Sequence, residues 1–562
     1  MKFSKILNLV LVALTSKVSA ATSKDNFFDN YKRADLFTLT DYNVPDIYIN
    51  MDKEEFNALI YSASVNAIDI SGGVPPPPPP PGAKGSSDNG PGDIPEEFSH
   101  LIINPGTKEE ENLKITDASL KFVLNGETTE IPSISISIGG DHSRNTSKVS
   151  FNLKCNKGKL LGRKVFRLRT NDDDPSLMRS KISCDIVNHL GLPSISANYA
   201  RLHINEEFMG LYVLMDHYKT SWIKQVYPDD KEVKNLYQCK EMSSDLSASS
   251  YNSCVNANDD YPEDKEDLKE FLETINAASN RSEIDDIMDV DTFIKYWILE
   301  WLLGSGDHML INGKNYYLYK QLNGIWTVLY YDFDSLFGVS LNRYTFDHDT
   351  ATEIPFSDWY FSRPIVDTLV KNDEASFLKN LQFIIDNAFN PDILFPHIDS
   401  IKNWIDLYIL EDRTPVNGTL PGRINEFGFS NNYNYEQFLN NVEYTSYGHV
   451  YGIKEWIQRR YNFVCENYDV KCPNFKKTEE TEDIFSTKMV KEEDEEEVTF
   501  ILDNEQTIIP NNEIDEIITE NVDYNNDDGD EEKEEEDKDE AIDIDADIDD
   551  EEDSFNEGDI KN

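Results

Sequence analysis

The sequence has no apolar run after residue 20 that reaches the ~18 residues a transmembrane helix requires. It also lacks the paired cysteine and histidine spacings that mark zinc sites. Basic residues are scarce, with 52 lysines and arginines against 106 aspartates and glutamates, for a formal net charge of −54. Because no basic stripe is present to displace counterions, we do not expect nucleic acid as a partner.

The amino-terminal residues 1–20 have the pattern of a secretory signal peptide, with two early lysines, a short apolar stretch and small residues before position 21. Six cysteines follow, and an even number in a secreted chain favours disulfides. The first expected pairs are the local ones, Cys239–Cys254 and Cys465–Cys472. Glycosylation sequons fit the same route and occur at Asn145, Asn280 and Asn417. We therefore expect a secreted protein, extracellular or at the cell surface.

Composition divides the rest of the chain into three parts. Residues 21–130 are expected to be rich in β-strand and to carry a proline-rich inserted loop at 72–97, which could alternatively dock onto an aromatic groove. Residues 131–475 are expected to form the main domain. Residues 476–562 form an acidic tail expected to be disordered, and 478–562 hold 38 acidic against 5 basic residues. Solvation is its first expected role, with loose Ca²⁺ buffering or a basic partner as alternatives.

Hydrophobic periodicity predicts strands in the first half and helices in the second. The serine–isoleucine alternation over 133–138 is the period-two pattern of a half-buried strand. A helix is predicted after Asp174 and Pro175, and a hairpin around residues 206–210. From about 358 to 470 the pattern is mostly helical. We therefore predict an α+β fold with two lobes and a cleft between them.

The main chemical signal is a set of acids and amides around a predicted hairpin. Asp307 precedes Asn312 by five positions, and a strand, a turn at 323–324 and a second strand lead to Asp332 and Asp334. Phosphoryl transfer needs an acid near the attacking hydroxyl, and it needs an amide and carboxylates that bind Mg²⁺. Protein kinases carry these groups in the same order along the chain. Asn315 competes with Asn312 for the amide role. On a strand, the two later acids would share one side.

A nucleotide site also needs a cation for the phosphates, and the candidate is Lys148, at the head of a predicted strand. Ser143 and Arg144, just before it, could supply further donors. The preceding Gly139 and Gly140 are too few to form a phosphate-cradling loop by themselves.

These segments, taken together, resemble the CotH family, the spore-coat-protein-H-like atypical kinases also found on fungal cell surfaces. The matching segments are 143–144, 148–151, 166–169, 178–181, 190–193, 204–205, 210–212, 315–319 and 331–338. Two departures are the Gly139-Gly140 pair, where Arg-Gly is usual, and Tyr331, where Trp is common. A glycan on Asn145 would lie beside Lys148.

The resemblance implies a reduced protein-kinase-like fold that uses ATP and Mg²⁺ to phosphorylate Ser or Thr of secreted proteins. Carried over by position, Lys148 would contact phosphate, Asp307 would face the acceptor hydroxyl, and Asp332 and Asp334 would bind metal. The competing expectation from the same family is an inactive surface adhesin or invasin that binds a cell-surface receptor.

Overall fold

The structure, a computed structural model, describes residues 26–28, 33–70, 113–242, 244–339, 341, 348–445 and 450–475. The expected signal peptide, proline-rich loop and acidic tail lie outside these residues. The described residues all belong to one compact unit. Within them, no helix combines the length and apolar character needed to cross a membrane.

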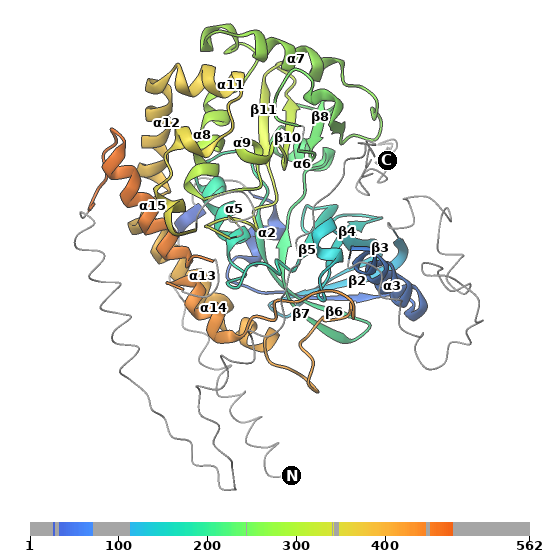
Figure 1. Ribbon diagram of the computed structural model, residues 1–562. Coiled ribbons are helices and arrows are strands. Elements are labelled where there is room, and N and C mark those ends of the chain that lie inside the picture. The colour runs from blue at the N-terminus through green and yellow to red at the C-terminus, as the bar shows by residue number, and fades with distance from the viewer. Residues whose placement is uncertain are drawn as a thin grey trace, which may run out of the picture. The chain divides into compact units, whose positions relative to one another are not determined.

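Seven strands close into a barrel in the order β1-β2-β3-β4-β5-β7-β6 (Figure 1). The barrel closes because β6 pairs with β1 in parallel, whereas the other neighbours pair antiparallel. The strands are β1 (Asp46–Asn50), β2 (Lys114–Leu124), β3 (Glu127–Gly139), β4 (Ser150–Cys155), β5 (Val165–Arg169), β6 (Ala197–Ile204) and β7 (Glu207–Met215). The hairpin predicted around 206–210 is confirmed as β6–β7.

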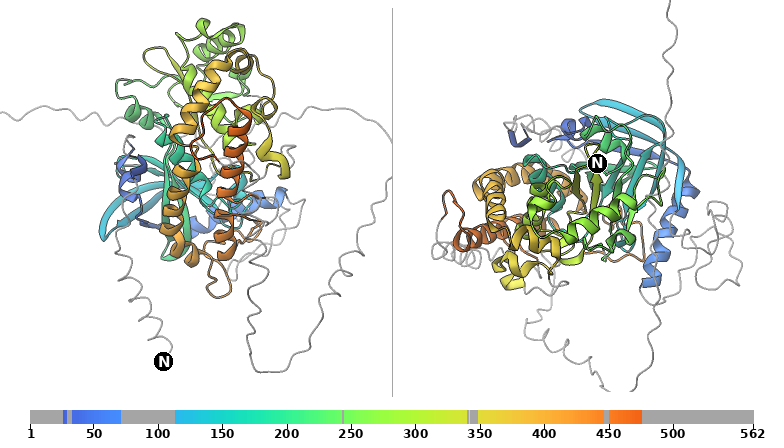
Figure 2. Two further views of the ribbon diagram at one scale, coloured as in Figure 1. Left: turned by 90° about the vertical axis from the view of Figure 1, so that its left-hand side faces the viewer. Right: turned by 90° about the horizontal axis from the view of Figure 1, so that it is seen from above.

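Strand β3 contains the serine–isoleucine alternation, and its isoleucines join the apolar core of the barrel. The alternate serines are buried too, since Ser135 and Ser137 are only 5% and 7% exposed. Ser135 Oγ donates to Asn156 Oδ1 at 2.7 Å. Helix α3 (Lys53–Ile70) contacts β2 and β3 from outside the barrel (Figure 2). The prediction of a half-exposed strand is therefore wrong at these serines.

Helix α5 (Arg179–His189) begins later than the sequence predicts. Pro175 lies before it in a turn, and the N-cap residue is Met178, so the predicted cap at Asp174 is wrong. Asp174 Oδ2 nevertheless accepts the backbone N–H of Arg179, the first residue of the helix, at 2.9 Å. The Arg179 side chain also donates to Asp174 Oδ1 at 2.5 Å, with both side chains fully buried. The apolar side of α5 packs in the core of the second half of the molecule.

After β7 the chain leaves the barrel through residues 216–219 and enters α6 (Thr220–Val226). A separate four-stranded sheet follows in the order β11-β10-β8-β9. Its strands are β8 (Leu236–Cys239), β9 (Cys254–Asn256), β10 (Tyr316–Lys320) and β11 (Trp326–Tyr330). Both predicted disulfides are confirmed, and Cys239–Cys254 joins directly opposed residues of β8 and β9.

Helices dominate the described residues after the second sheet. In both views of Figure 2, α13 (Pro391–Asp412) runs beside α15 (Ile453–Asn467), which it contacts. The other α-helices that follow α6 are α7 (Glu266–Ala277), α8 (Val290–Leu302), α9 (Met309–Asn312), α10 (Phe356–Trp359), α11 (Pro364–Val366), α12 (Glu374–Asn387) and α14 (Tyr435–Val442). Strands and helices thus mix as expected for an α+β protein, whereas a kinase-like bilobal arrangement stays a prediction.

Candidate functional site

Asp332 and Asp334 follow strand β11, which ends at Tyr330. They do not lie on the strand itself, because Asp332 has a left-handed backbone with φ of 66° and the residues after it form a turn. The prediction that strand geometry places both acids on one side is therefore wrong. The two side chains still come together, since both reach the guanidinium of Arg169.

Arg169 ends strand β5 of the barrel and faces both acids. Its Nη2 donates to Asp332 Oδ1 at 2.9 Å and to Asp334 Oδ2 at 3.4 Å. The two carboxylates remain accessible, with side chains 31% and 26% exposed. Desolvation and the negative charge of Asp332 raise the pKa of Asp334 to about 7, although Arg169 acts in the opposite direction. One guanidinium therefore compensates only part of the negative charge.

The turn after β3 approaches this arginine closely. Gly140 has φ of +79°, and a Cβ built on it would lie 2.7 Å from Arg169 Nη1. Only glycine adopts this backbone without strain and leaves room for the guanidinium. The glycine pair singled out in the sequence is thus adjacent to the cation that faces the acids.

Asp307 lies in the loop after helix α8 and accepts hydrogen bonds from both candidate amides. Asn312 Nδ2 donates to Asp307 Oδ1 at 3.0 Å, and Asn315 Nδ2 donates to Asp307 Oδ2 at 3.1 Å. Lys314 forms an ion pair with Asp307 Oδ1 at 2.9 Å. The choice between Asn312 and Asn315 stays open, because each side chain contacts the Asp307 carboxylate through its Nδ2 group and neither does so through its carbonyl oxygen.

Two interactions connect the Asp307 loop with the Asp332 turn. His308 is 2% exposed, and its Nε2 hydrogen-bonds the backbone oxygen of Tyr331 at 2.7 Å. Burial lowers its pKa. In addition, the charge of Asp307 contributes to the raised pKa of Asp334. The structure therefore brings Asp307, Asp332 and Asp334 to one region.

Lys148 has different partners. Its Nζ donates to Asp412 Oδ1 at 2.6 Å and to the backbone oxygen of Leu211 at 2.9 Å, and it lies over the ring of Tyr212. Among the described residues, none of its hydrogen bonds or ion pairs reaches the three site acids. Burial lowers the pKa of this lysine to about 8, against the attraction of Asp412.

The two other predicted donors turn toward the backbone. Ser143 Oγ donates to the backbone oxygen of Gly139, and Arg144 Nη2 donates to that of Ile138 at 3.3 Å. Both side chains are buried. They support the turn that contains Gly140, while their predicted contact with a cofactor stays a prediction.

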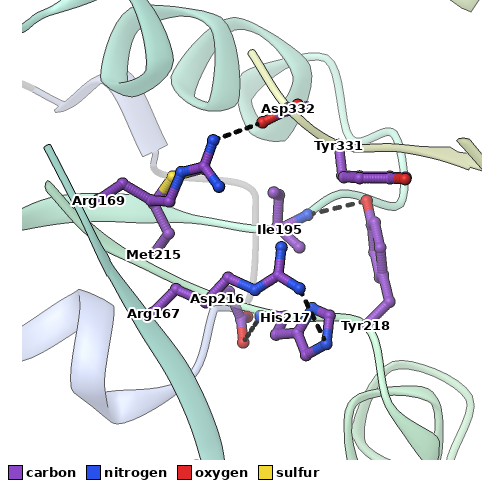
Figure 3. A pocket seen from close by; sticks show the side chains of 9 residues that line it. All are labelled: Arg167, Arg169, Ile195, Met215, Asp216, His217, Tyr218, Tyr331 and Asp332. Atoms are coloured by element: carbon purple, nitrogen blue, oxygen red, sulfur yellow. Dashed lines mark hydrogen bonds and ion pairs between the residues drawn. The ribbon is translucent and has the colours of Figure 1, made fainter. Parts of the chain in front are cut away.

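A pocket lies beside the Arg169–Asp332 pair, where the chain leaves β7 (Figure 3). Tyr218 lines the pocket and also contacts the second sheet, since its hydroxyl donates to the backbone oxygen of Tyr330 at 2.9 Å. The pocket is lined by Arg167, Arg169, Ile195, Met215, Asp216, His217, Tyr218, Tyr331 and Asp332. Aromatic and charged groups thus meet at the junction of barrel and second sheet.

The donor set fits a magnesium ion in chemical type. Mg²⁺ prefers one or two carboxylates with substrate phosphates completing its shell, and Asp332 and Asp334 are two adjacent carboxylates with excess negative charge. Within the described residues, no group of three or more His, Cys, Asp or Glu side chains forms a metal cluster. Carboxylates alone would therefore not complete the shell of such an ion.

The family comparison agrees with the resemblance seen in the sequence. A family model described as "CotH kinase protein" matches residues 136–464. The chain belongs to the CotH family. All of the acids and amides discussed above, and Arg169, lie within the matched range.

Several curated CotH relatives are similar at modest identity. Spore coat protein homolog 1 of Rhizopus delemar is 24% identical over 315 residues, covering 53% of this chain and 51% of the relative. Invasin CotH3 of the same organism is 23% identical over 385 residues, covering 63% and 62%. Inner spore coat protein H of Bacillus subtilis is 24% identical over 220 residues, covering 36% and 59%. The chain thus spans between about half and three fifths of the length of these relatives.

Proposed function

We propose that this CotH-family chain transfers the γ-phosphoryl group of ATP, bound with Mg²⁺, to a Ser or Thr hydroxyl of a secreted or extracellular protein. The observation that carries the proposal is the convergence of Asp307, Asp332 and Asp334 from two loops, beside the barrel residue Arg169. Phosphoryl transfer depends mainly on positioned charges, so acids from two loops that face the cations Arg169 and Lys314 suit it.

Each group has a role in the proposed reaction. Asp307, fixed by two amides and Lys314, would orient the acceptor hydroxyl and take up its proton. Asp332 and Asp334 would hold Mg²⁺, which supplies charge neutralisation to the phosphates when bound. Arg169 would then exchange its carboxylate partners for phosphate oxygens, which arginine recognises well.

The test is transfer of labelled phosphate from ATP with Mg²⁺ to the chain itself or to casein. Asp307→Ala, Asp332→Ala and Arg169→Gln should each lower the rate by about 10²-fold or more, because each removes a positioned charge. Asp264→Ala is a matched control, since Asp264 is 28% exposed and pairs with Lys234 at 2.8 Å outside the site. Unchanged transfer in a site variant would contradict the role of that residue, and absence of transfer by the parent would contradict the function.

A second candidate function rests on the names of two relatives. Two of the similar Rhizopus delemar proteins are named Invasin CotH7 and Invasin CotH3. By that likeness, the chain would act outside the cell or on its surface as a receptor-binding protein. Thermal unfolding separates the two functions, because ATP with Mg²⁺ stabilises a protein that binds them and leaves a pure adhesin unchanged.

A further inference from the structure

A buried carboxyl group lies beneath both loops of the candidate site. Glu300 is on helix α8, one turn before the Asp307 loop, and is 3% exposed. Its two hydrogen bonds reach none of the residues assigned to substrate or metal. Most buried acids among the described residues are paired with a base, as Asp174 is with Arg179, whereas the hydrogen bonds of Glu300 go to a hydroxyl and a backbone amide.

The two oxygens of Glu300 reach two different segments. Oε2 accepts the backbone N–H of Leu310 at 2.8 Å. Leu310 is in helix α9, which follows Asp307 and ends at Asn312. Oε1 accepts a hydrogen bond from the hydroxyl of Tyr330, the last residue of β11 and two positions before Asp332. A single side chain therefore joins the segment carrying the proposed acceptor-side acid to the segment carrying the proposed metal-side acids.

Other contacts fix the same junction. Arg363 Nη1 donates to the backbone oxygen of Leu310, so the backbone of this residue is bonded at both its N–H and its C=O. The ring of Tyr330 stacks on His308, with centroids 5.2 Å apart. The stacking thus restrains the ring of Tyr330, whose hydroxyl is hydrogen-bonded to Glu300.

We infer that Glu300 is a positioning residue that sets the separation of the Asp307 loop and the Asp332 turn. It acts through Leu310 and Tyr330 and touches no reacting atom. Removal of its polar group would leave a buried amide and a buried hydroxyl without this partner, and the two segments would be coupled only by the remaining contacts, such as the bond from His308 to Tyr331. The catalytic consequence of this inference rests on the proposed function, whereas its structural consequence does not.

The test is amide hydrogen exchange of the full chain, which reports local opening. Glu300→Leu should speed exchange at least about 10-fold in residues 307–316 and in 328–336, while helix α13 keeps the parent rate. Glu300→Gln should stay within about 2-fold of the parent, because its carbonyl oxygen can accept from the Leu310 amide while its NH₂ group donates to the hydroxyl oxygen of Tyr330. Glu455→Leu is the matched control, since Glu455 is 4% exposed on α15 and pairs with Arg459 of its own helix.

A change in only one of the two segments, or an even rise across the chain, would overturn the inference. If Glu300→Leu does not fold, Tyr330→Phe keeps the ring on His308 and removes only the hydroxyl. It should speed exchange of the Leu310 amide, and an unchanged rate there would overturn the bridge.

A kinetic measurement separates this inference from the proposed function. If the parent transfers phosphate, Glu300→Leu should lower kcat about 10-fold or more with little change in the KM for ATP, and Glu300→Gln should restore kcat. If the parent transfers nothing, the proposed function fails, and the exchange result still decides the role of Glu300.

Discussion

Among individual residues, Glu300 is one of the groups whose protonation should affect stability near neutral pH. Burial raises its pKa to about 8, although Tyr330, Leu310 and Arg363 favour the charged form. The folded protein therefore keeps a proton that the unfolded chain loses from about pH 4.5 upward, so this contribution to stability is present at low pH and is lost as pH rises to about 8.

Glu300→Gln should show this effect, because the amide cannot ionise. Between about pH 5 and pH 9, the free energy of unfolding of the parent should fall by about 2–4 kcal/mol relative to that of the variant. Urea unfolding at several pH values measures the difference. A constant difference across this range would show that the folded-state pKa of Glu300 is close to its ordinary value.

The residues of the candidate site differ in how far the sequence predicts them. Asp307, Asn312, Asn315, Asp332 and Asp334 stand near one another in the chain, on either side of one hairpin, so local pattern is sufficient to find them. Arg169 lies in one of the segments that carry the family resemblance, 166–169, but no local pattern indicates that it faces the acids, because it is 163 positions from Asp332 and an arginine at a strand end is ordinarily just solvated. Its role depends on how the barrel packs against the second sheet.

At the scale of elements, the turn after β3 should control Arg169. Gly140→Ala should weaken the stabilisation by ATP with Mg²⁺, because the new methyl group would lie against the guanidinium. Gly126→Ala is the matched control, since its φ of +85° causes similar backbone strain of about 1 kcal/mol but nothing lies within 4 Å of its added Cβ. Thermal unfolding with and without the nucleotide separates the two effects. Equal responses in both variants would contradict a link between this turn and Arg169.

Most elements were predictable because their signals are local. The hairpin β10–β11 follows from two apolar runs around Asn323-Gly324, and the disulfides follow from short spacing. The errors occur where distant partners decide the outcome. The serines of β3 are buried because polar neighbours such as Asn156 satisfy them, and the left-handed Asp332 ends the strand pattern before the acids. Barrel closure joins β1 to β6 over about 150 residues, which no short pattern predicts.

At the scale of the whole molecule, α13 is joined to the barrel by buried and exposed ion pairs at its carboxyl-terminal end. Asp412 accepts from Lys148 Nζ at 2.6 Å and from the backbone N–H of Leu211 at 2.8 Å. Beside it, Glu411 pairs with Arg201 of β6 at 2.8 Å. Removing one partner of a buried pair leaves an uncompensated charge, which typically costs about 3–5 kcal/mol. Lys148→Met should therefore destabilise the protein strongly.

This last prediction also decides between two roles for Lys148. If the lysine is a structural partner of Asp412, Lys148→Met should lower the free energy of unfolding by about 3–5 kcal/mol, and the double variant with Asp412→Asn should recover part of it. Lys234→Met, at an exposed pair with Asp264, should cost much less. The folded Lys148→Met protein should still be stabilised by ATP with Mg²⁺, whereas Arg169→Gln should not. If Lys148→Met keeps the stability of the parent but is no longer stabilised by ATP with Mg²⁺, the result would instead support the predicted contact of Lys148 with the phosphates.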